Sequence, residues 1–285
     1  MNLTIVPISG DERARGEPTQ ETIRAGYTAL HEQGAVILRG AFAPEFIDEL
    51  AGEFRARLPQ DQAGMLALST RPLPNPIQKV GDGRFEIAMR MTGPYGQPAM
   101  FANPLLMKFM FPLLGNDLMR LASVTLVASY PGAQMQHIHR DHQQLFQEFA
   151  NIGPALPMYA LNVSVPLIDI DLGIGPTAIW PGSHRWPEGK DAAPGEGMAS
   201  VPFQRGDAVL MDYRTIHTGM NNVSNVVRPI LYLVYTREWF FDDNNHRGRV
   251  PMDIPLEDIQ LLPAELHTLM MRAFQQGLRV RQYTR

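Results

Sequence analysis

Three histidines and one aspartate lie within seven residues of the sequence "QHIHRDH", from Gln136 to His142. Side chains of this kind bind a metal ion when two or more of them reach the same point in space. If the stretch is a β-strand, successive side chains point to opposite faces, so His137, His139 and Asp141 share one face. The sequence therefore offers two pairs that could chelate one ion, His137 with His139 or His139 with Asp141.

The two pairs predict different kinds of metal site. A His-x-His pair is typical of cupins, which also need a glutamate a few residues later, and the next glutamate here, Glu148, is too far along. A His-x-Asp pair needs one distant histidine to complete the two-histidine, one-carboxylate triad of non-haem iron(II) oxygenases. His217 meets this need, because it follows a strand-like run and a polar turn in "GDAVLMDYRTIHTGMNN". The pattern favours the second kind of site.

An arginine, Arg228, opens the next strand-like run, eleven residues after His217. A planar guanidinium at this place can bind one end of a dicarboxylate through two parallel hydrogen bonds, which a lysine does less well. A His-x-Asp pair alone occurs by chance in many proteins. The order of His-x-Asp, a distant histidine at a strand end and an arginine opening the next strand is far more specific.

Together these residues resemble a known family. The sequence is similar to the phytanoyl-CoA dioxygenase (PhyH) family of iron(II)- and 2-oxoglutarate-dependent oxygenases, especially its bacterial and fungal natural-product members. The resemblance covers roughly residues 20 to 243 and rests on five stretches: "EQGAVILRGAF", "PGAQMQHIHRDH", "GPTAIWPGSHRW", "RGDAVLMDYRTIHTGMNN" and "RPILYLVYTREWF". It implies a mainly β fold with flanking helices, the double-stranded β-helix or jelly-roll barrel.

The resemblance also implies the metal and the reaction. Matched residue by residue, the iron ligands fall on His139, Asp141 and His217. Iron(II) held in this way leaves two positions for 2-oxoglutarate and one for dioxygen. The family converts 2-oxoglutarate to succinate and carbon dioxide and oxidises a nearby substrate. Hydroxylation is the usual outcome, although related enzymes also desaturate, epimerise, form rings or install peroxides.

The resemblance further implies the co-substrate contacts. Arg228 matches the arginine that binds the distal carboxylate of 2-oxoglutarate, and Thr177 matches a threonine that helps to hold it. Gln136 matches a glutamine that contacts the co-substrate in similar proteins. Strict strand alternation places Gln136 on the face opposite His139, so this assignment requires a twist or bulge near Gln134.

The substrate pocket is harder to predict than the metal site. His137 lies on the ligand face, but the triad is already complete, so we predict a place for it in the pocket. The helical N-terminal part and variable loops shape the pocket in the family, and here they would present Arg84 and Phe85. The net charge of −4 and the absence of a Lys/Arg-rich run disfavour nucleic acid and the nucleotide end of coenzyme A. We therefore expect a small natural-product substrate, with an acyl-CoA as the alternative.

Two other functions are compatible with this fold. A non-catalytic jelly-roll binding module would tolerate the loss of a metal ligand or of the arginine, and here all four residues are present. A halogenase of the same superfamily would carry Gly or Ala in place of the carboxylate, and Asp141 is intact. Both alternatives are disfavoured.

Other residues with metal-binding chemistry have simpler interpretations. We interpret His184, in "PGSHRW", as a structural residue of a hydrogen-bonded turn. The stretch "DDNN", Asp242 to Asn245, is interpreted as a polar turn, and His142 as a residue that faces solvent or a neighbouring loop.

The elements that must position these residues form one predicted domain. Residues 1–18 are polar, lack periodicity and are expected to be a loose tail, and 19–58 carry helical patterns that include a stop at Gly34. The Pro/Gly-rich segment 59–83 is predicted to be a long loop. Strand-like runs between turn signals place the β core at about 120–243. Residues 244–285 are expected to form a helical extension.

Composition limits the setting in which the protein works. The content of 45% hydrophobic and 19% charged residues is that of a globular protein with ample material for a core. There is no cysteine, which excludes disulfides, thiolate metal sites and cysteine nucleophiles. We expect a cytoplasmic enzyme with a small-molecule partner and no nucleic-acid or membrane partner, of undetermined oligomeric state.

Overall fold

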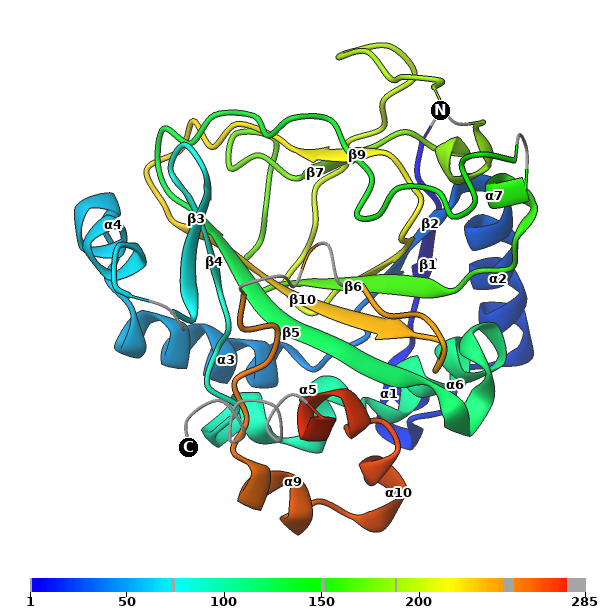
Figure 1. Cartoon of the computed structure of the whole chain (residues 1–285), viewed down its shortest axis with the longest axis horizontal. Helices are drawn as coiled ribbons and strands as arrows, with labels where there is room; N and C mark the ends of the chain where they lie inside the picture. The colour runs from blue at the N-terminus through cyan, green and yellow to red at the C-terminus, as the bar shows by residue number, and fades with distance from the viewer. Residues whose placement is uncertain are drawn as a thin grey trace.

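A large β-sheet, covered by helices on one face and by a small sheet on the other, makes up the fold (Figure 1). The computed structural model describes residues 2–72, 75–149, 152–187, 189–242, 245 and 249–275. The strands are β1 (Ile5–Pro7), β2 (Ala35–Arg39), β3 (Ile77–Gly81), β4 (Arg84–Ile87), β5 (Arg120–Ser129), β6 (Ala160–Pro166), β7 (Thr177–Ile179), β8 (Ala208–Asp212), β9 (His217–Gly219) and β10 (Arg228–Thr236).

Short helices connect and flank these strands. The α-helices are α1 (Gly10–Arg15), α2 (Gln20–Gln33), α3 (Pro44–Arg57), α4 (Gln62–Ser69), α5 (Pro98–Phe101), α6 (Pro104–Leu114), α7 (Ile152–Ala155), α9 (Leu256–Leu261) and α10 (Ala264–His267). Single 3-10 turns are η1 (Gly93–Gly96), η2 (Asn116–Leu118) and η3 (Ser183–Arg185). In the described part of the chain, every helix is too short or too polar to cross a lipid bilayer.

The large sheet has eight strands in the order β1-β2-β8-β6-β10-β5-β4-β3. All neighbours are antiparallel except β1 and β2, which are parallel. The small sheet pairs β7 with β9. Strands distant in sequence are therefore neighbours, as in a jelly roll, and the predicted double-stranded β-helix with flanking helices is confirmed.

The two faces of β10 show how the sheet separates core from site. Leu231 and Leu233 pack on the helical side, in the main core cluster with residues of α3, α5 and α6. Ile230 and Tyr232 point the other way, into the space between the two sheets. Because side chains alternate along a strand, the residues that face the small sheet can be polar without weakening the main core.

Residues 1–18 are not the loose tail that their polarity suggests. Three of these residues form β1, which pairs with β2, and Ser9 begins α1 with a capping box. In this box the backbone N–H of Glu12 donates to Ser9 Oγ at 3.2 Å, and the N–H of Ser9 donates to Glu12 Oε2 at 2.9 Å. The Glu12 carboxylate is buried and also accepts from Thr22 Oγ1 at 2.6 Å. The polar residues satisfy one another, which composition alone does not reveal.

The predicted long loop at 59–83 is also wrong, because it contains α4 and β3. Asp61 caps α4 by accepting the N–H of Gly64 at 2.8 Å, and β3 pairs with β4 at the edge of the sheet. The prediction of a helix ending at Gly34 is correct, since α2 ends one residue earlier and Gly34 adopts a left-handed conformation. The C-terminal extension contains α9 and α10 as expected, while residues 276–285 lie outside the described residues.

Candidate metal centre and co-substrate site

Three potential metal ligands meet between the two sheets. His139, Asp141 and His217 each place one ligand atom within 4.8 Å of the others, and His217 Nε2 lies 3.4 Å from Asp141 Oδ1. Two backbone hydrogen bonds join the segment of His139 to the start of β9. The N–H of His139 donates to the carbonyl of His217 at 3.0 Å, and the N–H of His217 donates to the carbonyl of His139 at 2.8 Å. The sheet geometry therefore brings together residues 78 positions apart in the sequence (217 − 139).

Backbone carbonyls orient both imidazole rings. His139 Nδ1 lies 2.8 Å from the carbonyl oxygen of His137, and His217 Nδ1 lies 3.0 Å from that of Thr215. A ring that donates its Nδ1–H to a carbonyl keeps the lone pair of Nε2 free for a metal. Burial, and then the nearby His217, lower the pKa of His139 to about 3, so the ring is the neutral form that a metal requires.

A neighbouring amide orients the carboxylate in the same way. Asn162 Nδ2, from β6, donates to Asp141 Oδ2 at 3.0 Å, which leaves Oδ1 directed toward His217. Two imidazoles and one carboxylate, each held by a further hydrogen bond, form a donor set suited to a divalent iron ion with open positions. The residues present therefore fit the predicted iron site.

The segment that carries the ligands is irregular rather than a regular strand. It pairs with β9 only through isolated contacts, such as the backbone N–H of Gln136 with the carbonyl of Gly219 at 3.0 Å. Strict alternation does not hold here, so Gln136 and His137 both line the same cavity as His139. This removes the conflict that alternation raised for Gln136, and it places His137 in the pocket beside the ligand group.

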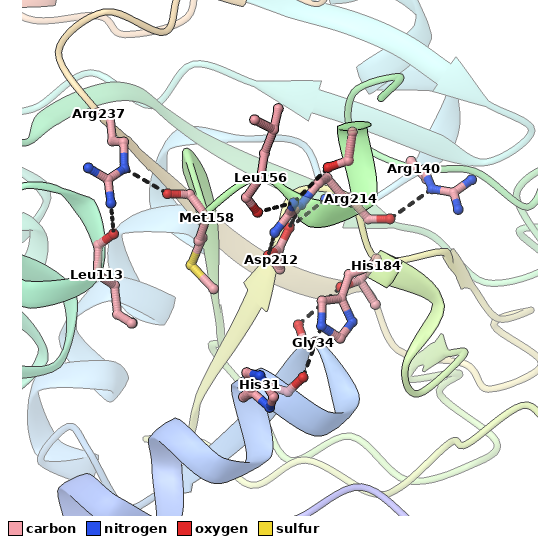
Figure 2. Close-up of polar contacts among 12 residues, drawn as sticks. His31, Gly34, Leu113, Arg140, Leu156, Met158, His184, Asp212, Arg214 and Arg237 are labelled. Atoms are coloured by element: carbon pink, nitrogen blue, oxygen red, sulfur yellow. Dashed lines mark hydrogen bonds and ion pairs between the residues drawn. The ribbon is translucent and has the colours of Figure 1, made fainter. Parts of the chain in front are cut away.

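A buried hub holds the turn before His217 (Figure 2). The guanidinium of Arg214 pairs with Asp212, with Nη2 2.7 Å from Oδ2, and Nη1 donates to the carbonyls of Gly153 and Leu156. Arg140, which lies between two of the ligands in sequence, donates from Nε to the carbonyl of Arg214 at 2.9 Å. The hub therefore connects the ligand loop and the turn that presents His217.

His184 belongs to the structural framework next to this hub. Its ring is buried, and Nε2 lies 3.2 Å from the carbonyl oxygen of His31 at the end of α2 (Figure 2). A β-carbon added at Gly34 would lie 2.5 Å from His184 Nδ1, so the close approach of α2 requires glycine there. Burial lowers the pKa of His184 to about 4. The contacts of His184 are therefore those of a structural residue, as we interpreted it from the sequence.

Two buried arginines lie at one end of the space between the sheets. Arg84, Ser129 and Arg228 occupy one rung across the neighbouring strands β4, β5 and β10, so their side chains share a face. Arg228 donates to the carbonyl of Gly175, and Arg84 donates to three carbonyls of the surrounding loops. Neither arginine forms an ion pair with any of the described residues.

Three polar atoms of this rung have no hydrogen-bond partner, although all are buried. They are Arg84 Nη1, Ser129 Oγ and Arg228 Nε. Burial, and then the charge of Arg228, lower the pKa of Arg84 to about 9. Two desolvated cations with unused donors cost free energy unless a ligand of opposite charge completes the arrangement. The rung is therefore suited to bind an anion such as a carboxylate.

The predicted co-substrate residues surround this rung. Thr177 is buried at the start of β7, and its side chain hydrogen-bonds to Tyr232. A β-carbon at Gly219 would lie 2.4 Å from Gln136 Oε1 and 2.9 Å from Arg84 Nη1. A side chain at this position would therefore displace the amide of Gln136 and the guanidinium of Arg84 from the places that they occupy.

A cavity of about 320 Å³ connects the metal ligands with Gln136 and Thr177, while Arg228 is not among its lining residues. Its lining residues are Val80, Glu86, Ser123, Thr125, Val127, Gln136, His137, His139, Arg140, Asp141, Asn162, Thr177, Tyr213, His217, Gly219, Tyr232, Val234, Asn245 and Arg249. This size is at the lower end of ligand pockets in proteins.

The two N-terminal pocket residues predicted from the sequence do not line this cavity. Phe85 is buried on the opposite face of β4, where it packs edge-on against Tyr130, so its prediction as a pocket residue is wrong. Arg84 faces the space between the sheets but lies in the rung with Arg228. Alternation along β4 brings Glu86 to the cavity in place of Phe85.

The "DDNN" stretch contributes more than the expected polar turn. Asp242 is buried and accepts from the Tyr213 hydroxyl at 2.8 Å and from the side chain of Asn245 at 2.7 Å. Asn245 Nδ2 also donates to the carbonyl of Asp141. Asn245 therefore contacts the ligand loop directly, which its sequence did not indicate.

Comparison with known proteins identifies the family of this chain. The family model for "Phytanoyl-CoA dioxygenase (PhyH)" matches residues 30–230, which is more than half of the chain. The chain belongs to this family. The multifunctional dioxygenase ausE of Emericella nidulans is 26% identical over 231 residues, covering 74% of this chain and 72% of the relative. The dioxygenase hkm4 of Aspergillus hancockii is 26% identical over 224 residues, covering 73% and 69%.

Solved structures share the fold of this family member. The epimerase SnoN from nogalamycin biosynthesis superposes with a TM-score of 0.57 at 18% identity, covering 82% of this chain and 91% of SnoN. HygX from Streptomyces hygroscopicus, solved with nickel and 2-oxoglutarate, superposes with a TM-score of 0.58 at 14% identity, covering 83% and 96%. The predicted family and the predicted dioxygenase class are confirmed, and the predicted iron and 2-oxoglutarate cofactors agree with these findings.

Proposed function

We propose that this dioxygenase uses iron(II) and 2-oxoglutarate to oxidise a small natural-product molecule, by hydroxylation in the simplest case. His139, Asp141 and His217 would hold the iron. The observation that carries the proposal is the convergence of their ligand atoms within 4.8 Å, with both Nδ1 atoms already used by backbone carbonyls. That arrangement is expected for a facial metal site.

The co-substrate would bind between the metal ligands and the buried rung. Arg228 and Arg84 supply the guanidinium groups for its distal carboxylate, and Ser129 supplies an unused hydroxyl. Thr177 and Gln136 line the route from the rung to the ligands. Charge-assisted hydrogen bonds in such a desolvated place are about twice as strong as neutral ones, which favours a dicarboxylate over a monocarboxylate.

Iron, 2-oxoglutarate and dioxygen together supply the oxidising chemistry when they are bound. The protein contributes ligand orientation through Asn162 and the backbone carbonyls of His137 and Thr215. We also infer a cytoplasmic location, because the cell interior supplies 2-oxoglutarate and reduced iron.

The experiment that tests this function is succinate release from 2-oxoglutarate by the iron-loaded enzyme in air. Slow release without substrate, dependent on iron and abolished in Asp141→Ala, is the expected result. Release that continues in Asp141→Ala, or metal-loaded protein that never consumes 2-oxoglutarate, would contradict the proposal.

A further inference from the structure

The cavity has one side with the metal ligands, a second side with the predicted co-substrate residues, and a third wall distinct from both. It is built by β3, β4 and β5 together with the segment after β10. Its members are Val80, Glu86, Ser123, Thr125, Val127, Asn245 and Arg249. Most of these side chains can form hydrogen bonds, in contrast to the apolar walls common in small-molecule sites.

An ion pair forms the centre of this wall. Arg249 Nη1 lies 2.7 Å from Glu86 Oε2, and the Thr125 side chain also hydrogen-bonds to the Glu86 carboxylate. The Glu86 side chain is 24% exposed and that of Arg249 is 39% exposed, so both retain unused hydrogen-bonding capacity toward the cavity. A carboxylate and a guanidinium side by side offer an acceptor and several donors at one place.

Further polar groups extend this wall toward the metal ligands. Ser123 and Thr125 are buried on the inner face of β5, whose other face is apolar. Asn162 Oδ1 is buried and has no hydrogen-bond partner, while its Nδ2 is occupied by Asp141. Buried polar groups cost free energy when they are unpaired, so a purely hydrocarbon ligand would be a poor match for this surface.

The charges of the wall limit the ligand further. Glu86 and Arg249 neutralise each other, and the other cavity-lining cation among the described residues, Arg140, donates to the carbonyls of Arg214 and Ser183. A polyanion such as a coenzyme A ester would meet only one partly neutralised arginine here. The wall is suited to an uncharged ligand rich in hydroxyl and carbonyl oxygens.

We propose that Glu86 and Arg249 form a substrate-recognition pair that binds neighbouring oxygen groups of a polyhydroxylated or glycoside-like substrate. Glu86 accepts from one hydroxyl, and Arg249 donates to the adjacent oxygen. The pair determines specificity and takes no part in the oxidation itself. This inference rests on the proposed function, because it assigns the substrate of the same site.

The test is ligand-observed saturation-transfer NMR on the enzyme loaded with zinc and 2-oxoglutarate, which prevents turnover. The probes are two sets of similar size, methyl glycosides and cyclitols in one set and cyclic monoterpene hydrocarbons in the other. We expect transfer to the hydroxylated set. In Glu86→Gln and Arg249→Gln the binding should weaken about tenfold, the loss expected for one hydrogen bond to a charged group.

The matched control is Glu53→Gln, which breaks a surface ion pair of the same length, 2.7 Å between Glu53 Oε2 and Arg57 Nε on α3. This variant should bind the probes like the wild type. Binding of the hydrocarbon set, no binding of any hydroxylated probe, or equal binding by all variants would overturn the inference. Succinate release by the iron-loaded wild type is measured in parallel, so that failure of the proposed function is distinguished from failure of the recognition pair.

Discussion

The two arginine-bearing regions of the site differ in burial and in pairing. At the co-substrate end, Arg84 and Arg228 are 0% and 1% exposed, and neither forms an ion pair among the described residues. On the third wall of the cavity, which we assign to the substrate and call the substrate wall, Arg249 is partly exposed and pairs with Glu86. A buried, unpaired cation is costly and is retained where one fixed anion must always bind. A paired, partly exposed cation costs little and can adapt to different ligands.

Removing a metal ligand should have the largest effect, because both regions depend on the metal between them. His139→Ala and His217→Ala should lose iron binding and all turnover. His137→Ala should keep the metal, since the His137 ring lies outside the ligand group. The hydrogen bond that orients His139 comes from the backbone carbonyl of His137, which the variant retains, and only the packing of the two rings, with centroids 4.6 Å apart, is lost. Iron content after anaerobic loading and desalting checks both outcomes, and the reverse pattern would show that the ligand assignment is wrong.

Removing the buried guanidinium of Arg228 should affect only the binding of 2-oxoglutarate. Arg228→Ala should raise the KM for 2-oxoglutarate by about 10- to 100-fold, the loss of a charge-assisted bidentate contact. Iron affinity should change little. The matched control, Arg90→Gln, breaks an exposed ion pair with Asp253 and should leave the KM unchanged. An unchanged KM for 2-oxoglutarate in Arg228→Ala would show that the buried arginine does not bind this anion, and the proposed difference between the two arginine-bearing regions would be wrong.

Removing the amide that holds the carboxylate ligand should give an intermediate effect. Asn162→Ala leaves Asp141 Oδ2 without its donor at 3.0 Å. Loss of such an orienting partner weakens metal affinity by about tenfold in comparable sites. Competition with a fluorescent chelator for manganese(II) measures the change, and full affinity in the variant would show that Asn162 does not orient the ligand.

Acidification should weaken substrate binding modestly, through the protonation of Glu86. Burial raises the pKa of Glu86, and the charge of Arg249 only partly offsets this. Glu86 is therefore protonated, and loses its charge, at a higher pH than an ordinary glutamate. In the wild type, the KM for substrate should rise by about a few-fold as the pH falls through the raised pKa of Glu86, because the ion pair with Arg249 is then lost. The same profile in Glu86→Gln would assign the effect to another group.

The sequence predicted the residues whose chemistry is specific and local. The His-x-Asp pair, the distant histidine and the arginine at the next strand start each carry an unusual residue type at a fixed place in the pattern. The structure brings the three ligands together and places Arg228 on the inner face of β10. The β core and the helix ending at Gly34 follow from periodicity and a glycine stop signal.

Other features depend on contacts between distant segments and could not be predicted from the sequence. The pairing of β1 with β2, the rung that joins Arg84 to Arg228, and the contact of Asn245 with the ligand loop all arise from strand order. Phe85 was misplaced because the direction of a side chain depends on register, and one residue of shift reverses it. Asn162 carries no local signal, since a lone asparagine in an apolar strand has many explanations.

The most direct test of the account is an anaerobic titration of 2-oxoglutarate into the iron-loaded protein, followed by the charge-transfer absorption that appears when a 2-oxo acid chelates iron(II). We predict a band in the wild type that saturates at one equivalent of 2-oxoglutarate and is absent in His217→Ala. In Arg228→Ala it should require a much higher 2-oxoglutarate concentration. A wild-type protein that binds iron but gives no band, or a band that persists in His217→Ala, would contradict the assignment of this site.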